Sequence, residues 1–137
     1  MPVANDEYVI DASAASISLV RKDAVGKAVA KLIENSTCHA PHLIDAEVGN
    51  VLRRHERKGL IDTTTAAIGV RMMATMVDQR YALHGWLSEE AWKLRHTITF
   101  YDGLYAALAA RLDIVLLTSD AKLSRAPGLP CRIELID

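Results

Sequence analysis

Short apolar runs alternate along this chain of 137 residues with longer segments of helical periodicity, and two of the runs are closely followed by an aspartate. The runs have the length of buried strands rather than of helices. Strands that are separated by helices imply crossover connections and a parallel sheet with helices on both faces. The expected fold class is therefore α/β: a three-layer α/β/α sandwich with a short, mainly parallel β-sheet.

The same patterns give the expected order of elements. Strands are expected at residues 8–10, 37–40, 81–86, 115–118 and 131–135. Helices are expected at residues 22–34, 42–57, 63–80 and 103–112, and two more begin at residues 11–13 and at Ser88. Gly59 suits the end of the helix over residues 42–57. No repeat or flexible linker interrupts this order, so residues 1–137 are expected to form a single domain.

Composition excludes several classes of protein. Half of the residues are hydrophobic, but no apolar run approaches the length of a membrane span. The first residues, "MPVANDEYVIDAS", lack the basic start and apolar stretch of a secretion signal. Cys38 and Cys131 are too few and too far apart for a zinc cluster or a disulfide framework. These features favour a cytoplasmic protein.

Four acidic residues stand at positions that attract attention. Asp11 and Asp120 follow the strands at residues 8–10 and 115–118, and Asp102 precedes an alanine-rich helix. Each aspartate alone is explained by the common role of Asp as a helix N-cap. Glu47 is different because it lies inside a helix, beside the buried stripe, where a carboxylate needs a partner, water or a cation. For Glu47 the sequence leaves pairing with Arg53 or Arg54 open as the alternative.

The four acids together suggest a metal site. Carboxylates at the ends of parallel strands, joined by one from a flanking helix, are expected to meet at one edge of the sheet. Carboxylates at close range raise each other's pKa unless a divalent cation neutralises them, and oxygen ligands select Mg²⁺, with Mn²⁺ as a substitute. Such a site suits the hydrolysis of a phosphodiester. Without the four acids the chain carries 16 basic and 13 acidic residues, a net charge of +3 that is compatible with a polyanionic substrate.

Four motifs resemble a known family. They are "YVIDASA" at 8–14, "PHLIDAEVGNVLRR" at 41–54, "TFYDGLYAALAARL" at 99–112 and "LLTSDAKL" at 116–123. Together they resemble the PIN-domain ribonucleases, and among these most of all the VapC toxins of bacterial toxin–antitoxin pairs. The motifs follow the family order from residue 8 to residue 123, and the likeness is weakest over residues 60–98.

The resemblance implies a Mg²⁺-dependent endoribonuclease, the toxin of a type II toxin–antitoxin system, which forms a homodimer and is held silent by a VapB-like antitoxin. It carries over a catalytic set of four acids, Asp11, Glu47, Asp102 and Asp120. The three aspartates would bind the metal, and Glu47 would orient a water, help to bind a second ion or act as a general base. Polar positions that would orient the carboxylates are Ser13, Asn50 and Thr118, although local cap or turn bonds explain each of them equally well.

The basic run "RRHERKG" at 53–59 supplies candidate RNA contacts, above all Arg53 and Arg54. The alternative explanation is that these basic side chains complement the dipole at the C-terminus of the helix and have no contact with RNA. Met72, Met73 and Met76 fit core filling, whereas the family resemblance implies that an exposed Met in these helices meets the antitoxin.

Two other functions stay open on the residues alone. One is a phosphatase or receiver-like domain with a strand-end Asp as nucleophile. Such domains carry a pair of acids on the first strand, and "VIDAS" offers one. The other is an α/β metal-binding module without nuclease activity, in which the acids hold structure.

Overall fold

Five parallel strands form one sheet in the computed structural model of the chain, which describes residues 6–136. The strands are β1 (Glu7–Ile10), β2 (Thr37–Pro41), β3 (Gln79–Tyr81), β4 (Val115–Thr118) and β5 (Ile133–Leu135). Their order is β3-β2-β1-β4-β5, so β1 pairs with β2 on one side and with β4 on the other. The winding of the chain reverses at β1, and sites in such sheets lie beyond the carboxyl ends of the strands at this switch point.

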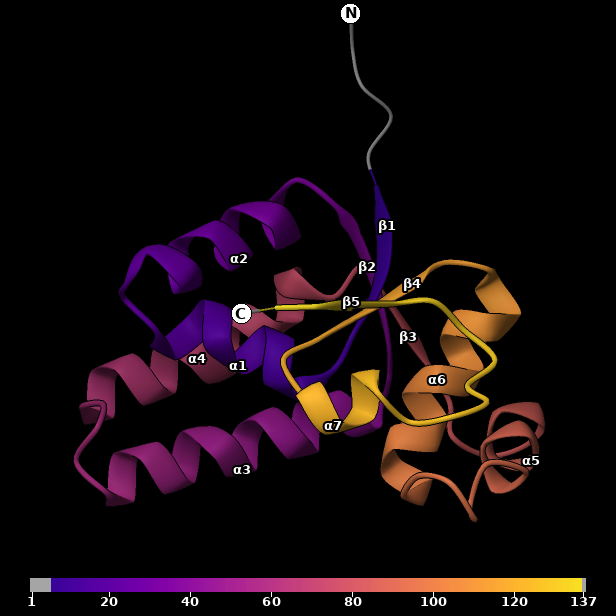
Figure 1. Cartoon of the computed structure of the whole chain (residues 1–137). Coiled ribbons are helices and arrows are strands. Elements are labelled where there is room, and N and C mark those ends of the chain that lie inside the picture. The colour runs from indigo at the N-terminus through magenta and orange to yellow at the C-terminus, as the bar shows by residue number, and fades with distance from the viewer. Residues whose placement is uncertain (1–5, 137) are drawn as a thin grey trace, which may run out of the picture.

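Helices cover both faces of this sheet (Figure 1). They are α1 (Ala12–Val20), α2 (Ala24–Glu34), α3 (Leu43–Arg57), α4 (Thr63–Met76), α5 (Trp86–Trp92), α6 (Phe100–Leu112) and α7 (Ala121–Ser124). α1 to α4 pack together on one face, and α5 and α6 pack together on the other. The predicted α/β/α architecture is confirmed. None of the helices within residues 6–136 is long and apolar enough to cross a bilayer.

The centre of the sheet is buried on both faces. Val9 and Ile10 of β1 and Leu116 and Leu117 of β4 have no exposed surface. A continuous apolar run of this kind, without alternation, is typical of parallel strands between two helical layers. The two central strands are therefore the most constrained part of the fold, and the residues that directly follow them are placed with little freedom.

The region between α4 and α5 differs from the sequence expectation. The helix predicted over residues 63–80 ends at Met76, and the strand predicted over residues 81–86 is shifted to Gln79–Tyr81. The cause is non-local. The backbone N–H of Asp78 donates to the carbonyl of Cys38 in β2, and the Asp78 carboxylate accepts from the N–H of Cys38 at 2.8 Å. Pairing with β2 therefore draws this segment out of the helix, and nothing in its own pattern predicts that.

The other boundaries are closer to expectation. Gly59 has a φ of +71° just after α3, as its position at the helix end predicts. α5 begins two residues before Ser88, and the strand expected at residues 131–135 is limited to β5. α6 begins at Phe100, three residues earlier than predicted, because the hydroxyl of Thr99 caps it by accepting from the N–H of Asp102 at 3.1 Å.

Gly103 sets the distance between α6 and α5. A Cβ at this position would lie 3.0 Å from the carbonyl oxygen of Ala91 and 3.4 Å from its Cβ. Only a glycine allows this close approach, so the first turn of α6, with Asp102 in it, is held against α5.

We expect Gly103→Ala to destabilise the protein by about 1–2 kcal/mol, because overpacking outweighs the better helix propensity of alanine. Gly49→Ala in α3 is the matched control. A Cβ at that position meets nothing within 4 Å, so alanine should raise stability by up to about 1 kcal/mol. Urea unfolding of both variants measures the difference, and equal stabilities would contradict the close-approach argument.

Candidate functional site

Asp11 is the most buried acid of the site. It directly follows β1, is 6% exposed, and caps α1 by accepting from the N–H of Ala14 at 2.9 Å. The hydroxyl of Ser13 donates to the same carboxylate oxygen, Oδ1, and the hydroxyl of Thr118 donates to Oδ2. The carboxylate thus has three donors in the protein. Its orientation is determined from two elements, α1 and β4.

Burial raises the pKa of Asp11 above its ordinary value. Hydrogen bonds from Ser13, Thr118 and Ala14 oppose this shift, while the negative charge of Asp120 adds to it. A buried carboxylate with a raised pKa is a high-energy anion, and a nearby cation would relieve that cost.

Asp120 lies beyond the adjacent strand, β4. It is exposed and caps the short helix α7 by accepting from the N–H of Leu123 at 3.1 Å. Its own N–H donates to the hydroxyl of Thr118 at 3.1 Å, and the N–H of Ser119 donates to the hydroxyl of Ser13 at 2.9 Å. Ser13 and Thr118 therefore connect the loop that carries Asp120 to the carboxylate of Asp11.

Asp102 is not at a strand end, contrary to the sequence expectation of three strand-end carboxylates. It is in the first turn of α6 and is half-buried, and Thr99 rather than Asp102 is the N-cap. Its pKa is raised, first by burial and then by the charges of Asp120 and Asp11. Asp102, from α6, is therefore within range of the charges of the two acids that follow β1 and β4.

Glu47 projects from α3 toward the same region. The alternative of an ion pair with Arg53 or Arg54 is not what the structure shows, because Glu47 accepts from the phenol of Tyr105 at 2.6 Å. Burial raises the pKa of Glu47, the Tyr105 bond lowers it, and the charges of Asp11 and Asp102 raise it again. The cost of placing this carboxylate inside a helix is thus offset by a phenol from α6.

Tyr105 is a site residue that sequence reasoning missed. It is 2% exposed and lies one helical turn after Asp102. Burial raises the pKa of Tyr105, and the negative charge of Glu47 raises it further, so the phenol stays a donor. The sequence did contain a signal for this residue. Tyr105 carries the one hydroxyl in the alanine-rich segment "LYAALAARL", and a buried phenol needs a hydrogen-bond partner.

Three of the predicted polar residues make no hydrogen bond or ion pair with the acids. Asn50, Arg53 and Arg54 are exposed on α3, and no ion pair or side-chain hydrogen bond within residues 6–136 joins them to an acid of the site. Arg54 is seven residues beyond Glu47, about 10 Å farther along the helix axis at 1.5 Å per residue. Their proposed roles remain predictions.

The donor set fits a hard divalent cation in its chemistry. Asp11, Glu47 and Asp102 each have a raised pKa to which at least one other acid of the group contributes, and all the donors are carboxylate oxygens. Among residues 6–136, however, no three Asp, Glu, His or Cys side chains are already gathered tightly enough to hold an ion. Binding would therefore need movement of side chains, for which the exposed Asp120 and the half-buried Asp102 and Glu47 have room.

Comparisons with known proteins identify a family and a shared fold. A family model described as PIN domain matches residues 8–129. Ribonuclease VapC1 of Mycobacterium tuberculosis is 44% identical over 131 residues, covering 96% of this chain and 98% of that protein. Two solved structures share the fold. VapBC2 from Rickettsia felis, bound to a DNA fragment from its promoter, has a TM-score of 0.69 at 14% identity and covers 96% of this chain and 99% of its own. VapC20 of Mycobacterium tuberculosis, described as a Sarcin-Ricin loop cleaving toxin, has a TM-score of 0.68 at 17% identity. The match covers 90% of this chain and 96% of VapC20.

The raised pKa of Asp102 has a consequence for stability in the absence of metal. A carboxyl group whose pKa is higher in the folded state stabilises the fold fully below its unfolded pKa, about 3.9, and loses that contribution as the pH rises through the folded pKa. In EDTA we therefore expect Asp102→Asn to melt at a higher temperature than the wild type at pH 7.5. The advantage should shrink as the pH falls toward 4.

Asp23→Asn is the control, because Asp23 is a helix N-cap whose pKa is lowered, first by its hydrogen bond with Arg21, rather than raised. It should show no such pH-dependent gain. Melting temperatures across this pH range, measured by circular dichroism, test the expectation. A destabilised Asp102→Asn at pH 7.5 in EDTA would contradict the repulsion between the acids.

Proposed function

The chain belongs to the PIN-domain family and, within it, to the VapC ribonucleases, and from this premise we propose that it is a Mg²⁺-dependent endoribonuclease, the toxin of a type II toxin–antitoxin pair. The observation that carries the proposal is the placement of the acids: the charge of Asp11 raises the pKa of Glu47 and Asp102, and the charge of Asp120 raises the pKa of Asp11 and Asp102. Asp11 and Asp120 also cap α1 and α7, but capping does not account for Glu47 or for the repulsion among the acids, which a cation would relieve. The 44% identical ribonuclease supports the substrate class.

The four acids have different roles in this proposal. Asp11 and Asp102 contact the Mg²⁺ ion directly, and Asp120 completes the metal site, either directly or through water. Bound Mg²⁺ supplies a Lewis acid for the phosphodiester, and Mn²⁺ can replace it. Glu47 orients the attacking water, helps to hold a second ion or takes a proton as a general base.

The polar residues behind the acids position them. Ser13 and Thr118 direct the two oxygens of Asp11, and Tyr105 directs Glu47. Carboxylates that are oriented in this way keep their free lone pairs toward the ligand. We retain Asn50 as a weaker candidate for the same role, since it shares the Glu47 face of α3 but is exposed.

Two competing functions are disfavoured by particular observations. A receiver-like or phosphatase domain needs an accessible nucleophilic aspartate after its first strand, and Asp11 is 6% exposed with three donors on its carboxylate. A purely structural role for the acids does not account for the half-buried Asp102, since Thr99 already caps α6. A labile phospho-aspartate after incubation with a small phosphodonor would support the first alternative.

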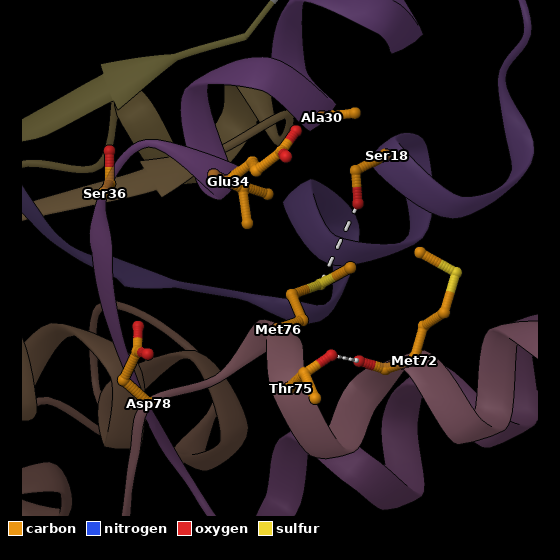
Figure 2. Close-up of a pocket in the computed structure, with 9 residues that line it drawn as sticks. Ser18, Ala30, Glu34, Ser36, Met72, Thr75, Met76 and Asp78 are labelled. Atoms are coloured by element: carbon orange, nitrogen blue, oxygen red, sulfur yellow. Dashed lines mark hydrogen bonds between the residues drawn. The ribbon is translucent and has the colours of Figure 1, made fainter.

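We also propose where the antitoxin binds. α1, α2 and α4 enclose a groove of about 470 Å³, shown in Figure 2, with Met72 and Met76 on one side and Glu34 on the other. Met73 is buried as core filling and Met76 is half-buried, but Met72 is 47% exposed, as is Ile68 one turn earlier on α4 at 43%. An antitoxin segment with apolar and basic side chains fits this surface.

We further propose that residues 1–137 act as one PIN-like domain, that the protein works in the cytoplasm, and that the chain forms a homodimer. The single sheet that joins the first and last strands supports the first of these. Arg53 and Arg54 remain candidate RNA contacts, at a distance from the acids.

The catalytic assignment predicts loss of RNA cleavage in Asp11→Asn and in Asp102→Asn, because each removes a metal ligand while keeping the shape of the side chain. Asp23→Asn is the control, since Asp23 caps α2 as Asp11 caps α1 but lies outside the site. Cleavage of structured RNA in Mg²⁺, and growth arrest on expression, should vanish in the first two variants and persist in the control.

Thermal melts with and without Mn²⁺ provide a second measurement. A cation that binds only the folded state raises the melting temperature by mass action. This increase should occur in the wild type and in Asp23→Asn, and should be lost in the two site variants. Full cleavage by both Asp11→Asn and Asp102→Asn would refute the mechanism.

The antitoxin surface predicts that Met72→Glu weakens binding of the product of a short reading frame directly upstream, because a buried charge replaces an apolar contact. RNA cleavage by the free protein should be unaffected. Ala74→Glu introduces the same charge at an exposed position on the opposite side of α4 and should bind normally. Isothermal titration calorimetry of the purified pair measures both, and normal binding by Met72→Glu would place the antitoxin elsewhere.

A further inference from the structure

A second groove, of about 770 Å³, has Asp102 and Asp120 among the residues that line it. One wall is the connection between α5 and α6, with Arg95 in it, and the other is α7 and the loop after it, with Lys122 and Arg125. The groove therefore begins at two of the proposed metal ligands and continues between three cationic side chains. The basic run of α3 does not contribute to it.

The three cations of this groove are not neutralised by the protein. No carboxylate within residues 6–136 lies within ion-pair distance of Arg95, Lys122 or Arg125. Arg21 and Arg80 elsewhere do have such partners, Asp23 and Asp45, whereas exposed arginines such as Arg53 and Arg54 have none in the part of the chain that the structure describes, so what distinguishes the three cations is the groove that they share. Cations that share a groove and lack partners are suited to an anionic ligand.

Arg95 is also held in place. Its guanidinium lies 4.7 Å from the ring centroid of Trp92, and its Nη1 donates to the carbonyl of Trp92 at 2.9 Å. Phe100 in turn packs edge-on against Trp92 at 6.4 Å. A side chain that is fixed by an aromatic ring and a carbonyl loses less entropy on binding than a freely solvated one.

An ordinary solvated surface is the simpler explanation for each charge alone. Complementation of a helix C-terminus accounts for Arg95, which donates to the last carbonyl of α5, but it is a weak account of Lys122 and Arg125 because α7 has four residues. It also leaves unexplained why all three cations line the groove that ends at Asp102 and Asp120.

We propose that this groove binds the phosphates of an unpaired RNA strand on one side of the scissile bond, with Arg95, Lys122 and Arg125 as the phosphate contacts and Trp92 as the residue that positions Arg95. This inference rests on the proposed nuclease function and adds the direction in which the strand leaves the acids. A single strand fits because recognition of duplex RNA uses a surface spanning about 16 base pairs, much more than this groove offers.

The test compares three variants of the full chain in EDTA, where cleavage does not interfere. The probe is a fluorescein-labelled single-stranded RNA 12-mer, titrated at several salt concentrations. In the wild type, log K should fall with log salt by about 0.7 for each phosphate contact. The double variant Lys122→Gln, Arg125→Gln should bind more weakly and reduce this slope by about 1.4. The matched control is Lys27→Gln, Lys31→Gln, which removes the same charge from exposed positions on α2, away from the groove, and should leave the slope unchanged.

Trp92→Leu tests the positioning role, because it keeps all three charges. We expect weaker RNA binding than in the wild type, with the salt slope reduced by no more than one contact. In Mg²⁺, the Lys122, Arg125 double variant should raise KM and leave kcat near the wild-type value, as expected for loss of uniform binding.

The outcomes separate this inference from the nuclease assignment. The wild type could cleave RNA while the Lys122, Arg125 double variant keeps the wild-type salt slope of RNA binding and the wild-type KM. In that case the groove proposal is wrong and the nuclease assignment stands. If the wild type cleaves no RNA yet the slope falls as expected, the groove is an RNA site and the nuclease assignment is wrong. A slope that falls equally in the Lys27, Lys31 control would show that overall charge, and not the groove, sets RNA binding, and would overturn the proposal. Dissociation of a dimer by the Lys122, Arg125 variant, with unchanged RNA binding, would make the groove a contact between copies and would also overturn the proposal.

Discussion

The buried carboxylate of Asp11 is the interaction on which the site depends. Its three donors come from α1 and from β4, and the same hydroxyls of Ser13 and Thr118 accept from the N–H groups of Ser119 and Asp120. One anion thus joins the ends of the two central strands to the first turn of α1 and to the loop before α7. Because the strands below are fully buried, this connection cannot shift without disturbing the core.

The parts of the site that sequence reasoning could locate are those that follow the central strands. The apolar runs of β1 and β4 identify them as strands, and the carboxyl ends of parallel strands lie at the same edge of a sheet. Asp11 and Asp120, which follow these strands, were therefore expected at that edge. Asp102 was placed at the wrong kind of position because the Thr99 cap lies three residues earlier than the alanine-rich pattern suggests. The Tyr105–Glu47 bond joins residues 58 positions apart, and β3 owes its place to contacts with β2. Neither has a local signal that periodicity can detect.

The acids show why such a site is costly for the fold and useful for chemistry. Burial and mutual repulsion raise the pKa of Asp11, Glu47 and Asp102, so the metal-free protein carries an unfavourable concentration of negative charge. The hydrogen bonds from Ser13, Thr118 and Tyr105 reduce that cost without removing the charge. In the proposed nuclease, a cation that drew these side chains together would turn the repulsion into attraction.

α1 relates the proposed substrate side of the molecule to the proposed partner side. Its first turn carries Ser13, which bonds to Asp11, and Ser18 near its end lines the groove between α1, α2 and α4, where its hydroxyl donates to the sulfur of Met76 at 3.8 Å. The two serines are five residues apart, about 7.5 Å along the helix axis. The groove beside Arg95, Lys122 and Arg125 is built instead from the second half of the chain, and so an antitoxin seated on α4 would leave it open. Inhibition from the α4 surface would then have to act through α1, whose Ser13 hydroxyl donates to Asp11. Otherwise a segment of the antitoxin would have to extend from the groove between α1, α2 and α4 to the acids.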